Sequence, residues 1–323
     1  MHSSRLPALV GALILAFASS TQAADQASGW PAQPIRLIVP FAPGGSNDVI
    51  ARRLSQRMSN DLGQTVVVEN RPGAGSTIGT QHVINSKPDG YTLLFVSNSL
   101  ATTPAVQNLP YDPTQSLTAI SMVASAPLVI VTRPGLAKTL PDLVRYAKAN
   151  PSKLNYGTAG IGDTNHLVTE MFAEAAGVKM EAVAYKGASP AQIDLATGRL
   201  DLMITTMASL RGTPADALPK LAFTAAARDA DHPDTPTVRE ATGLDFQASV
   251  WWGLFAPAGL PDSVVQALNR EVRAAVADPS VTTFLQSIGA QARASTPEEM
   301  RAVLAADVKQ FTEVAQRAGI RAQ

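Results

Sequence analysis

The amino-acid sequence predicts an α/β protein of two βαβ lobes with a ligand cleft between them. A succession of strand, loop, helix and strand begins near residue 35 and starts again near residue 127, and such units form parallel sheets covered by helices. A glycine-rich loop follows an early strand in each succession, and open α/β sheets bind ligands at that edge. The length of 323 residues is enough for two lobes and a sizeable core.

The first unit begins with a buried strand expected at residues 35–39, where β-branched residues cluster before a proline. The turn at residues 43–45 follows, and Asn47 or Asp48 can cap the next helix. In that helix, Ile50 and Leu54 lie four positions apart on one face. The rest of this unit is expected as a strand at 65–68, a helix at 78–86 and a strand at 91–96.

The second unit repeats this order in the middle of the chain. Its strands are expected at 127–132, 154–156, 182–185 and 201–205, and its helices at 140–149, 165–176 and 190–197. A late strand at 248–255 then leads into helices at 261–277 and 297–318. The spacing alone leaves open which lobe these last helices pack on.

Composition excludes several classes of protein. Lys+Arg and Asp+Glu both number 26, and no basic stripe interrupts this balance, so no nucleic-acid partner is expected. The absence of cysteine excludes disulfides, cysteine-ligated zinc and thiol nucleophiles.

Residues 1–24 have the order of a secretory signal peptide. Arg5 precedes an apolar run at 8–18, and Ala23 supplies a small residue for cleavage. The alternative is a membrane anchor, but the run falls short of the ~20 residues that span a bilayer. We therefore expect export to a periplasm as a freely soluble chain.

The first candidate binding loop covers residues 41–48. Its glycines let the backbone approach a ligand, and the amides at the start of the following helix favour an anion such as a carboxylate. The alternative is an ordinary turn with Asn47 or Asp48 as the helix cap.

The second candidate loop, at residues 157–164, offers the same kind of surface from the other lobe. Two such loops suit a two-sided anion clamp. Each hydrogen bond from a backbone amide to a carboxylate contributes roughly 1.5 to 3 kcal/mol. Three or four such bonds match the ~8 kcal/mol of micromolar binding without any Arg or Lys.

A third loop, at residues 70–76, lacks the glycine spacing of a dinucleotide fingerprint and the Gly-Lys-Ser/Thr of a phosphate loop. We expect it to hold the entry to the next helix, although Arg71 could neutralise a substrate.

Signatures of enzymes are mostly absent. The chain has neither a G-x-S-x-G elbow nor an H-E-x-x-H motif, and its four histidines are scattered. No metal site, cofactor or catalytic residue is therefore expected. His166 is expected to support the second loop, Asp201 to hold a hinge or face the cleft, and Trp251 or Trp252 to lie in the core or form a cleft wall.

Four motifs resemble a known family. They are PIRLIVPFAPGG at residues 34–45, VVENRPGAG at 67–75, PDGYTLL at 88–94 and WGLFAPAG at 252–259. They resemble the extracytoplasmic solute receptors of tripartite tricarboxylate transporters, the Bug family, from about residue 30 to the end of the chain. The resemblance implies a type II periplasmic-binding-protein fold whose two lobes close on a small carboxylate. Such ligands include di- or tricarboxylates, amino acids and related organic acids.

The resemblance also places the site on particular residues. The candidate ligand-binding residues are Phe41, Ala42, Pro43, Gly44, Gly45, Ser46, Asn47, Asp48, Thr158, Ala159, Gly160, Gly162, Thr164, His166, Tyr185 and Asp201. Many members have proline where this chain has Ala42, and Gly-Thr where it has Ser46 and Asn47. These departures change the floor of the pocket and leave the ligand's identity open.

The resulting hypothesis is a monomeric periplasmic receptor that delivers its ligand to a membrane permease or a sensor. Its first lobe is expected to comprise residues 30–125 and 250–323, and its second lobe residues 126–249. The alternative is an exported hydrolase or isomerase of small organic acids, using His166 with Asp163 or Asp201.

Overall fold

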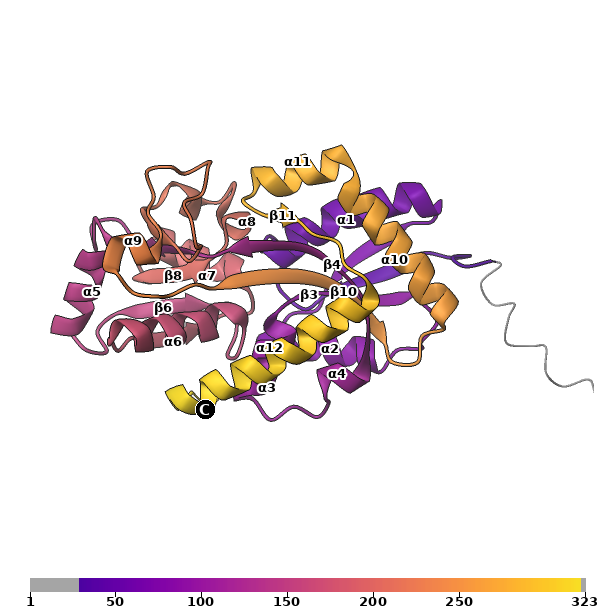
Figure 1. Cartoon of the computed structure of the whole chain (residues 1–323), viewed down its shortest axis with the longest axis horizontal. Helices are drawn as coiled ribbons and strands as arrows, with labels where there is room; N and C mark the ends of the chain where they lie inside the picture. The colour runs from indigo at the N-terminus through magenta and orange to yellow at the C-terminus, as the bar shows by residue number, and fades with distance from the viewer. Residues whose placement is uncertain (1–28, 321–323) are drawn as a thin grey trace, which may run out of the picture.

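The computed structural model describes residues 29–320, which form two α/β lobes around two separate sheets (Figure 1). We call the part built on the six-stranded sheet the first lobe and the part built on the five-stranded sheet the second lobe. The predicted signal peptide at 1–24 lies outside the described residues. Among residues 29–320, no helix combines the length and the apolar character that crossing a bilayer requires.

The first lobe contains both ends of the described chain. Its strands are β1 (Ile35–Val39), β2 (Val66–Asn70), β3 (Thr92–Ser97), β4 (Leu117–Pro127), β10 (Ser249–Pro257) and β11 (Gln291–Ala292). They lie in the order β11-β4-β10-β3-β1-β2. Strand β1 pairs in parallel with β2 and β3, as the βαβ pattern predicts.

The second lobe is built from the middle of the chain. Its strands are β5 (Val129–Thr132), β6 (Asn155–Thr158), β7 (Glu181–Ala184), β8 (Leu202–Thr205) and β9 (Lys220–Phe223), in the order β7-β6-β8-β5-β9. Alternate residues of β5 point to opposite faces, because Ile130 joins one apolar cluster and Val129 and Val131 join another. Both faces of this sheet are therefore covered.

Two long strands connect the lobes. The chain leaves the first lobe along β4 and returns along β10, so the two strands run antiparallel, side by side, through the middle of the molecule (Figure 1). In the second sheet, β5 likewise pairs antiparallel with β8 and β9. The parallel pairing expected from the βαβ pattern is therefore present in each sheet, next to antiparallel pairs that the pattern did not predict. Both sheets are mixed, because each contains antiparallel pairs near the place where the chain passes between the lobes. These pairs are β4 with β10 in the first sheet, and β5 with β8 and β9 in the second.

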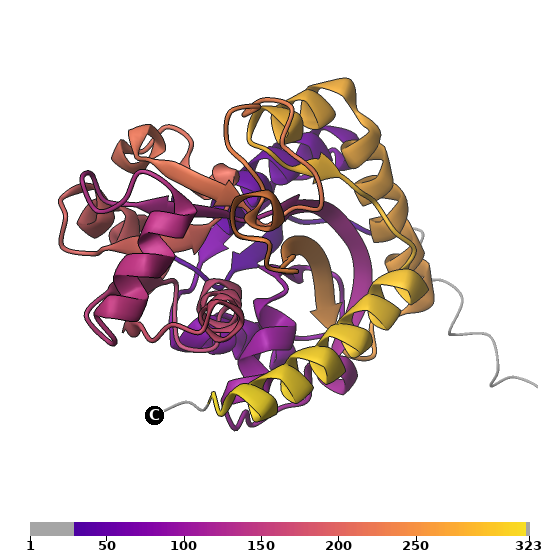
Figure 2. The same cartoon turned by 60° about the vertical axis from the view of Figure 1, so that its left-hand side comes forward.

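Helices cover both lobes. Their bounds are α1 (Ser46–Leu62), α2 (Thr77–Ile84), α3 (Ser99–Val106), α4 (Pro113–Ser116), α5 (Leu140–Ala149), α6 (Thr164–Ala176), α7 (Ala188–Ala196), α8 (Met207–Leu210), α9 (Val238–Thr242), α10 (Asp262–Ala277), α11 (Pro279–Ser287) and α12 (Pro297–Ala318), with short 3₁₀ turns η1 (Ala74–Ser76) and η2 (Pro214–Ala217). Helices α10, α11 and α12 pack on the first lobe and wrap its outer edge (Figure 2). Helix α12 also reaches across to α6 of the second lobe.

Local sequence signals set the ends of the long helices. Helix α12 begins with a capping box in which Thr296 and Glu299 bond each other's backbone amides, and Gly319 ends it in the left-handed conformation. Helix α1 ends at Gly63 in the same way. Gly45 precedes α1 without any side-chain cap, which leaves the first amides of α1 to other partners.

Candidate functional site

The two predicted loops meet at a small cavity between the lobes, of about 30 Å³, which we call the interlobe cavity. Its lining residues are Phe41, Gly45, Ser46, Asn47, Ser97, Ala159, Asp163, Thr164, Asn165, Ala188, Thr206, Ser209 and Val250. A volume of this size holds only one or two water molecules.

Three helices begin at the interlobe cavity. Ser46 starts α1, Thr164 starts α6 and Ala188 starts α7. The N-terminus of a helix carries a partial positive charge and unpaired amides, so this convergence favours an anion. No Lys, Arg or His lines the cavity, and helix amides and hydroxyl groups are therefore the groups available to hold one.

Contacts across one rim of the cavity hold α1 against the second lobe. The Ser46 amide donates to Ser209 Oγ at 3.1 Å, and the Ser189 hydroxyl donates to the Pro43 carbonyl at 2.8 Å. The Ala42 amide donates to the Lys186 carbonyl at 3.1 Å. Ala42, Pro43 and Gly44 thus contact the opposite lobe and do not line the cavity.

The other rim is closed by α3 and η1 against the second loop. The Thr102 hydroxyl donates to the Gly162 carbonyl at 2.7 Å, and the Gln107 side-chain amide donates to the Ile161 carbonyl. A Cβ atom added at Gly160 would lie 2.8 Å from the Cα of Gly75, so the backbones of the two lobes touch there. The two lobes are therefore in direct contact on this side of the cavity as well.

The second loop uses most of its amides internally, which corrects the expectation of a free amide cradle. The Gly160 amide donates to Thr158 Oγ1 at 3.3 Å, and the Gly162 amide donates to His166 Nδ1 at 3.1 Å. The carboxylate of Asp163 accepts from the amide of His166 at 3.0 Å and from that of Asn165. The Thr164 amide at the start of α6 has no acceptor among the described residues.

Two buried carboxylates shape the electrostatics of the loops. Burial raises the pKa of Asp163 to about 6, so this carboxyl group takes up a proton at a higher pH than an exposed aspartate does. Burial alone would also raise the pKa of Asp48, but hydrogen bonds from Arg52, Gly44 and Asn70 lower it overall. The ion pair of Asp48 with Arg52, at 2.9 Å, offsets the charge at the start of α1.

Six of the sixteen predicted site residues line the cavity, and the other ten lie outside its lining: Ala42, Pro43, Gly44, Asp48, Thr158, Gly160, Gly162, His166, Tyr185 and Asp201. Asp201 accepts from Arg133 Nε at 2.7 Å and from the Asn155 amide at 2.9 Å, so it holds strands of the second lobe together. The Tyr185 hydroxyl donates to Asp194. His166 is buried beneath the loop, and burial lowers its pKa, in keeping with the expected supporting role.

Sequence reasoning missed several lining residues. These are Ser97, Asn165, Ala188, Thr206, Ser209 and Val250, with Asp163 considered only for catalysis. Ser97 ends β3 and Thr206 follows β8, and the carboxyl ends of strands were a signal that could have identified both. Within residues 29–320, no group of three or more His, Asp or Glu is arranged to hold a metal ion.

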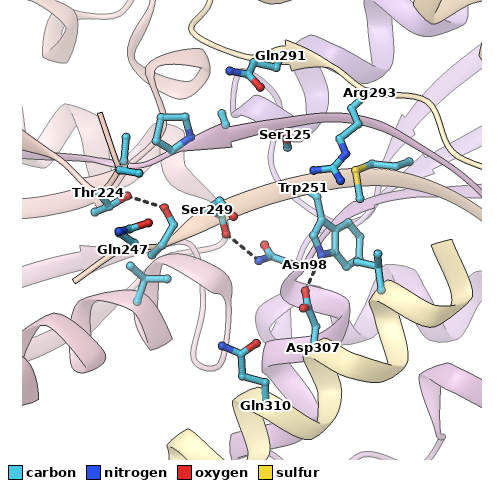
Figure 3. Close-up of a pocket in the computed structure, with 18 of the residues that line it drawn as sticks. Asn98, Ser125, Thr224, Gln247, Ser249, Trp251, Gln291, Arg293, Asp307 and Gln310 are labelled. Carbon is cyan, nitrogen blue, oxygen red and sulfur yellow. Dashed lines mark hydrogen bonds between the residues drawn. The ribbon is translucent and has the colours of Figure 1, made fainter. Parts of the chain in front are cut away.

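A larger cavity of about 530 Å³ lies beside the crossing strands, and we call it the hinge pocket (Figure 3). Trp251 forms part of its wall, and the indole Nε1 donates to Asp307 of α12 at 2.7 Å. Trp252, the next residue, is fully buried in the core of the first lobe. Despite its larger volume, the hinge pocket contains neither predicted loop, whereas residues of both loops line the interlobe cavity, which is therefore the candidate site.

Two α/β lobes joined by crossing strands and closed over a small cavity define a two-lobed solute-binding receptor. Residues 50–320 match the family TctC, described as the tripartite tricarboxylate transporter family receptor. The chain belongs to this family, which confirms the resemblance seen in its motifs.

Relatives cover nearly the whole chain. BugT of Bordetella pertussis is 35% identical over 326 residues, or 99% of each chain. A protein of Pseudomonas sp. strain P51, encoded in the tcbD-tcbE intergenic region, is 36% identical over 310 residues, or 92% of each chain.

Solved structures show the same fold. The periplasmic binding protein BugD superposes with a TM-score of 0.86 at 35% identity, covering 91% of this chain and 100% of its own. MatC of Rhodopseudomonas palustris, with bound malate, gives 0.83 at 28% identity, covering 88% and 99%. The predicted type II periplasmic-binding-protein-like fold is thus confirmed. The family consists of receptors and not enzymes, so nothing supports the alternative of a hydrolase or isomerase.

Proposed function

We propose that this protein is a periplasmic receptor that captures a small carboxylate between its lobes and delivers it to a membrane permease or a sensor. The observation that carries this proposal is the convergence of α1, α6 and α7 on the interlobe cavity, whose lining has no basic side chain. Such a site can hold a carboxylate through the helix amides that remain without a partner, such as that of Thr164, and through hydroxyls.

The ligand class is supported by the family's structures. One R. palustris relative, 34% identical with a TM-score of 0.86 and covering 90% of this chain and 99% of its own, was solved with adipate. MatC was solved with malate. Both ligands are small dicarboxylates, and we propose the same chemical class for this chain.

The proposed mechanism is closure of two bodies, residues 30–125 with 250–323 and residues 126–249. Hydrogen bonds such as Ser46 to Ser209 and Thr102 to Gly162 form only when the lobes meet. A ligand shifts the equilibrium toward closure by its greater affinity for the closed state. Since a dicarboxylate is larger than the present 30 Å³ cavity, we expect the side chains that line it to move aside around a ligand while the hydrogen bonds of both rims persist.

The cellular place of the receptor follows from the same proposal. Residues 1–24 would be removed during export, with cleavage near Ala23 or Ala24. Mass spectrometry of the protein from its native envelope tests this directly, because an intact Met1 terminus would contradict it.

A thermal-unfolding screen tests the function. Succinate, malate, adipate, aspartate and citrate are compared with 1,4-diaminobutane, which has no carboxylate. A ligand at 100 times its dissociation constant adds about 2.7 kcal/mol to the free energy of unfolding. In a chain of about 300 residues, with an unfolding entropy of about 0.6 kcal/mol/K, that raises the melting temperature by roughly 4 °C.

The proposal requires at least one carboxylate to give this shift while the diamine gives none. A screen in which no carboxylate stabilises the protein, or in which the diamine does so equally, would contradict it. Turnover of the stabilising acid would also contradict a receptor.

A further inference from the structure

The hinge pocket and the interlobe cavity lie on opposite faces of strand β10. Side chains alternate along a strand, and Ser249 and Trp251 line the hinge pocket whereas Val250 lines the interlobe cavity. On β4, Ser125 and Pro127, which pair with Trp251 and Ser249, also line the hinge pocket, as does Ala126 between them. The crossing strands therefore separate the two spaces.

The walls of the hinge pocket belong to both lobes. On the first lobe they include Phe311 of α12 together with Asp307 and Gln310, which Figure 3 labels, and on the second lobe Val168 and Met171 of α6. A hinge rotation of the lobes about the crossing strands changes the distance between α12 and α6 across this pocket.

Hydrogen bonds place the pivot of such a rotation at the floor of the pocket. Ala248 is tied to the second lobe, because its amide donates to the Thr224 carbonyl at 3.0 Å and its carbonyl accepts from Thr224 Oγ1 at 2.7 Å. The next residue, Ser249, is tied to the first lobe, because its carbonyl accepts from Asn98 Nδ2 at 3.2 Å. The lobe to which the chain is hydrogen-bonded therefore changes between residues 248 and 249, and Figure 3 shows the bond from Asn98 to Ser249.

We propose that the hinge pocket is the empty volume that α6 and α12 occupy when the lobes open. Side chains that fill this volume therefore hold the receptor closed. Rotation about residues 248–249 that widens the interlobe cavity narrows the space on the other face of β10. Helix α12 already touches α6 in the closed state, so the pocket is the free volume left between them. This inference rests on the proposed closure of the lobes but adds a second place from which closure is controlled.

Two substitutions fill the pocket from opposite walls. Gln310 and Ala226 are exposed lining residues of the first and second lobes, so Gln310→Trp and Ala226→Trp add bulk without disturbing the core. Lys309→Trp is the matched control, because Lys309 is the exposed neighbour of Gln310 and lies outside the lining. Met171→Ala removes bulk from the wall and therefore enlarges the hinge pocket, whereas the tryptophan substitutions reduce it.

The primary measurement needs no ligand. The chain has no cysteine, so Ile78→Cys and Ile193→Cys, both 55% exposed and on different lobes, can carry spin labels for a distance measurement. We expect both filling variants to raise the ratio of closed to open molecules at least threefold over Lys309→Trp, and Met171→Ala to lower it.

Affinity for malate and adipate provides the second readout. A shift in the closed population changes the apparent dissociation constant by up to the same factor. We therefore expect three- to tenfold tighter binding in the filling variants, through slower dissociation. If the filling variants and Met171→Ala all match the control in distance distribution, or if filling favours the open state, the inference is wrong. Failure to bind any carboxylate would instead contradict the proposed function. The distance measurement, which needs no ligand, would still test whether the hinge pocket controls the ratio of closed to open molecules.

Discussion

Gly160→Ala should weaken ligand binding by wedging the lobes apart. A Cβ atom at this position would lie 2.8 Å from the Cα and 2.9 Å from the amide nitrogen of Gly75 in the opposite lobe. Carbon atoms pack at about 3.5 to 4.0 Å, so the backbones must separate by roughly 1 Å. Neither neighbour is a flexible side chain that could turn away.

The magnitude follows from the bonds that this separation breaks. The Thr102 to Gly162 and Gln107 to Ile161 hydrogen bonds lie beside the contact, and each contributes about 0.5 to 1.5 kcal/mol. Their loss from the closed state weakens binding by about 1 to 3 kcal/mol, or roughly 5- to 150-fold. The φ of +151° at Gly160 adds strain of about 1 to 3 kcal/mol for alanine, but this strain lies within the second lobe and is present open or closed.

Titration calorimetry with the carboxylate that stabilises the wild type separates the two effects, with melting measured alongside in the absence of ligand. Gly198→Ala is the control, because Gly198 also has a positive φ, of +78°, but its added Cβ would meet only the Arg133 side chain at 4.0 Å. Both variants should lose stability, and only Gly160→Ala should lose affinity. Equal affinities of the two variants would refute the assignment of this contact to the closed state.

Three further outcomes follow from individual side chains. Arg71→Ala should change affinity less than tenfold, or ~1.4 kcal/mol, in the same calorimetric assay, because Arg71 pairs with Glu69 outside the interlobe cavity. Complete loss of binding in a folded variant would show that the anion site was assigned to the wrong groups. Asp201→Ala should lower stability in chemical denaturation by about 1 to 3 kcal/mol while leaving affinity unchanged, since it removes the bonds to Arg133 and Asn155. Burial raises the pKa of Asp163 from 3.8 to about 6, so the folded state holds the proton more tightly and this group's contribution to stability falls as the pH rises from about 4 to 6. The stability of Asp163→Asn relative to wild type should therefore rise by up to about 3 kcal/mol across that range, and a constant difference would contradict the raised pKa.

Much of the fold was predictable because its local signals agree with the tertiary structure. The helix predicted at 297–318 is α12, whose capping box and terminal glycine are visible in the sequence. The strand at 117–127 was missed, although it is the longest of the first sheet. β4 is buried along most of its length and crosses between lobes, so it shows no alternation of apolar and polar residues.

The candidate site was predictable to the level of loops and not of atoms. Residues 41–48 do bring Ser46 and Asn47 to the cavity. The sequence could not show that Asp163 turns its carboxylate back onto the amides of α6, because a cap and a ligand compete for the same donors. Nor could it place Ser209 opposite Ser46, since that contact spans 163 residues and exists only when the lobes meet.

The distance between the lobes, measured with and without ligand, tests closure on a carboxylate most directly. Spin labels at Ile78→Cys and Ile193→Cys report it in solution, in a chain that has no other cysteine. Saturation with the stabilising carboxylate should convert a longer, broader distance distribution into a shorter, narrower one. A distribution unchanged at saturation would contradict capture by lobe closure.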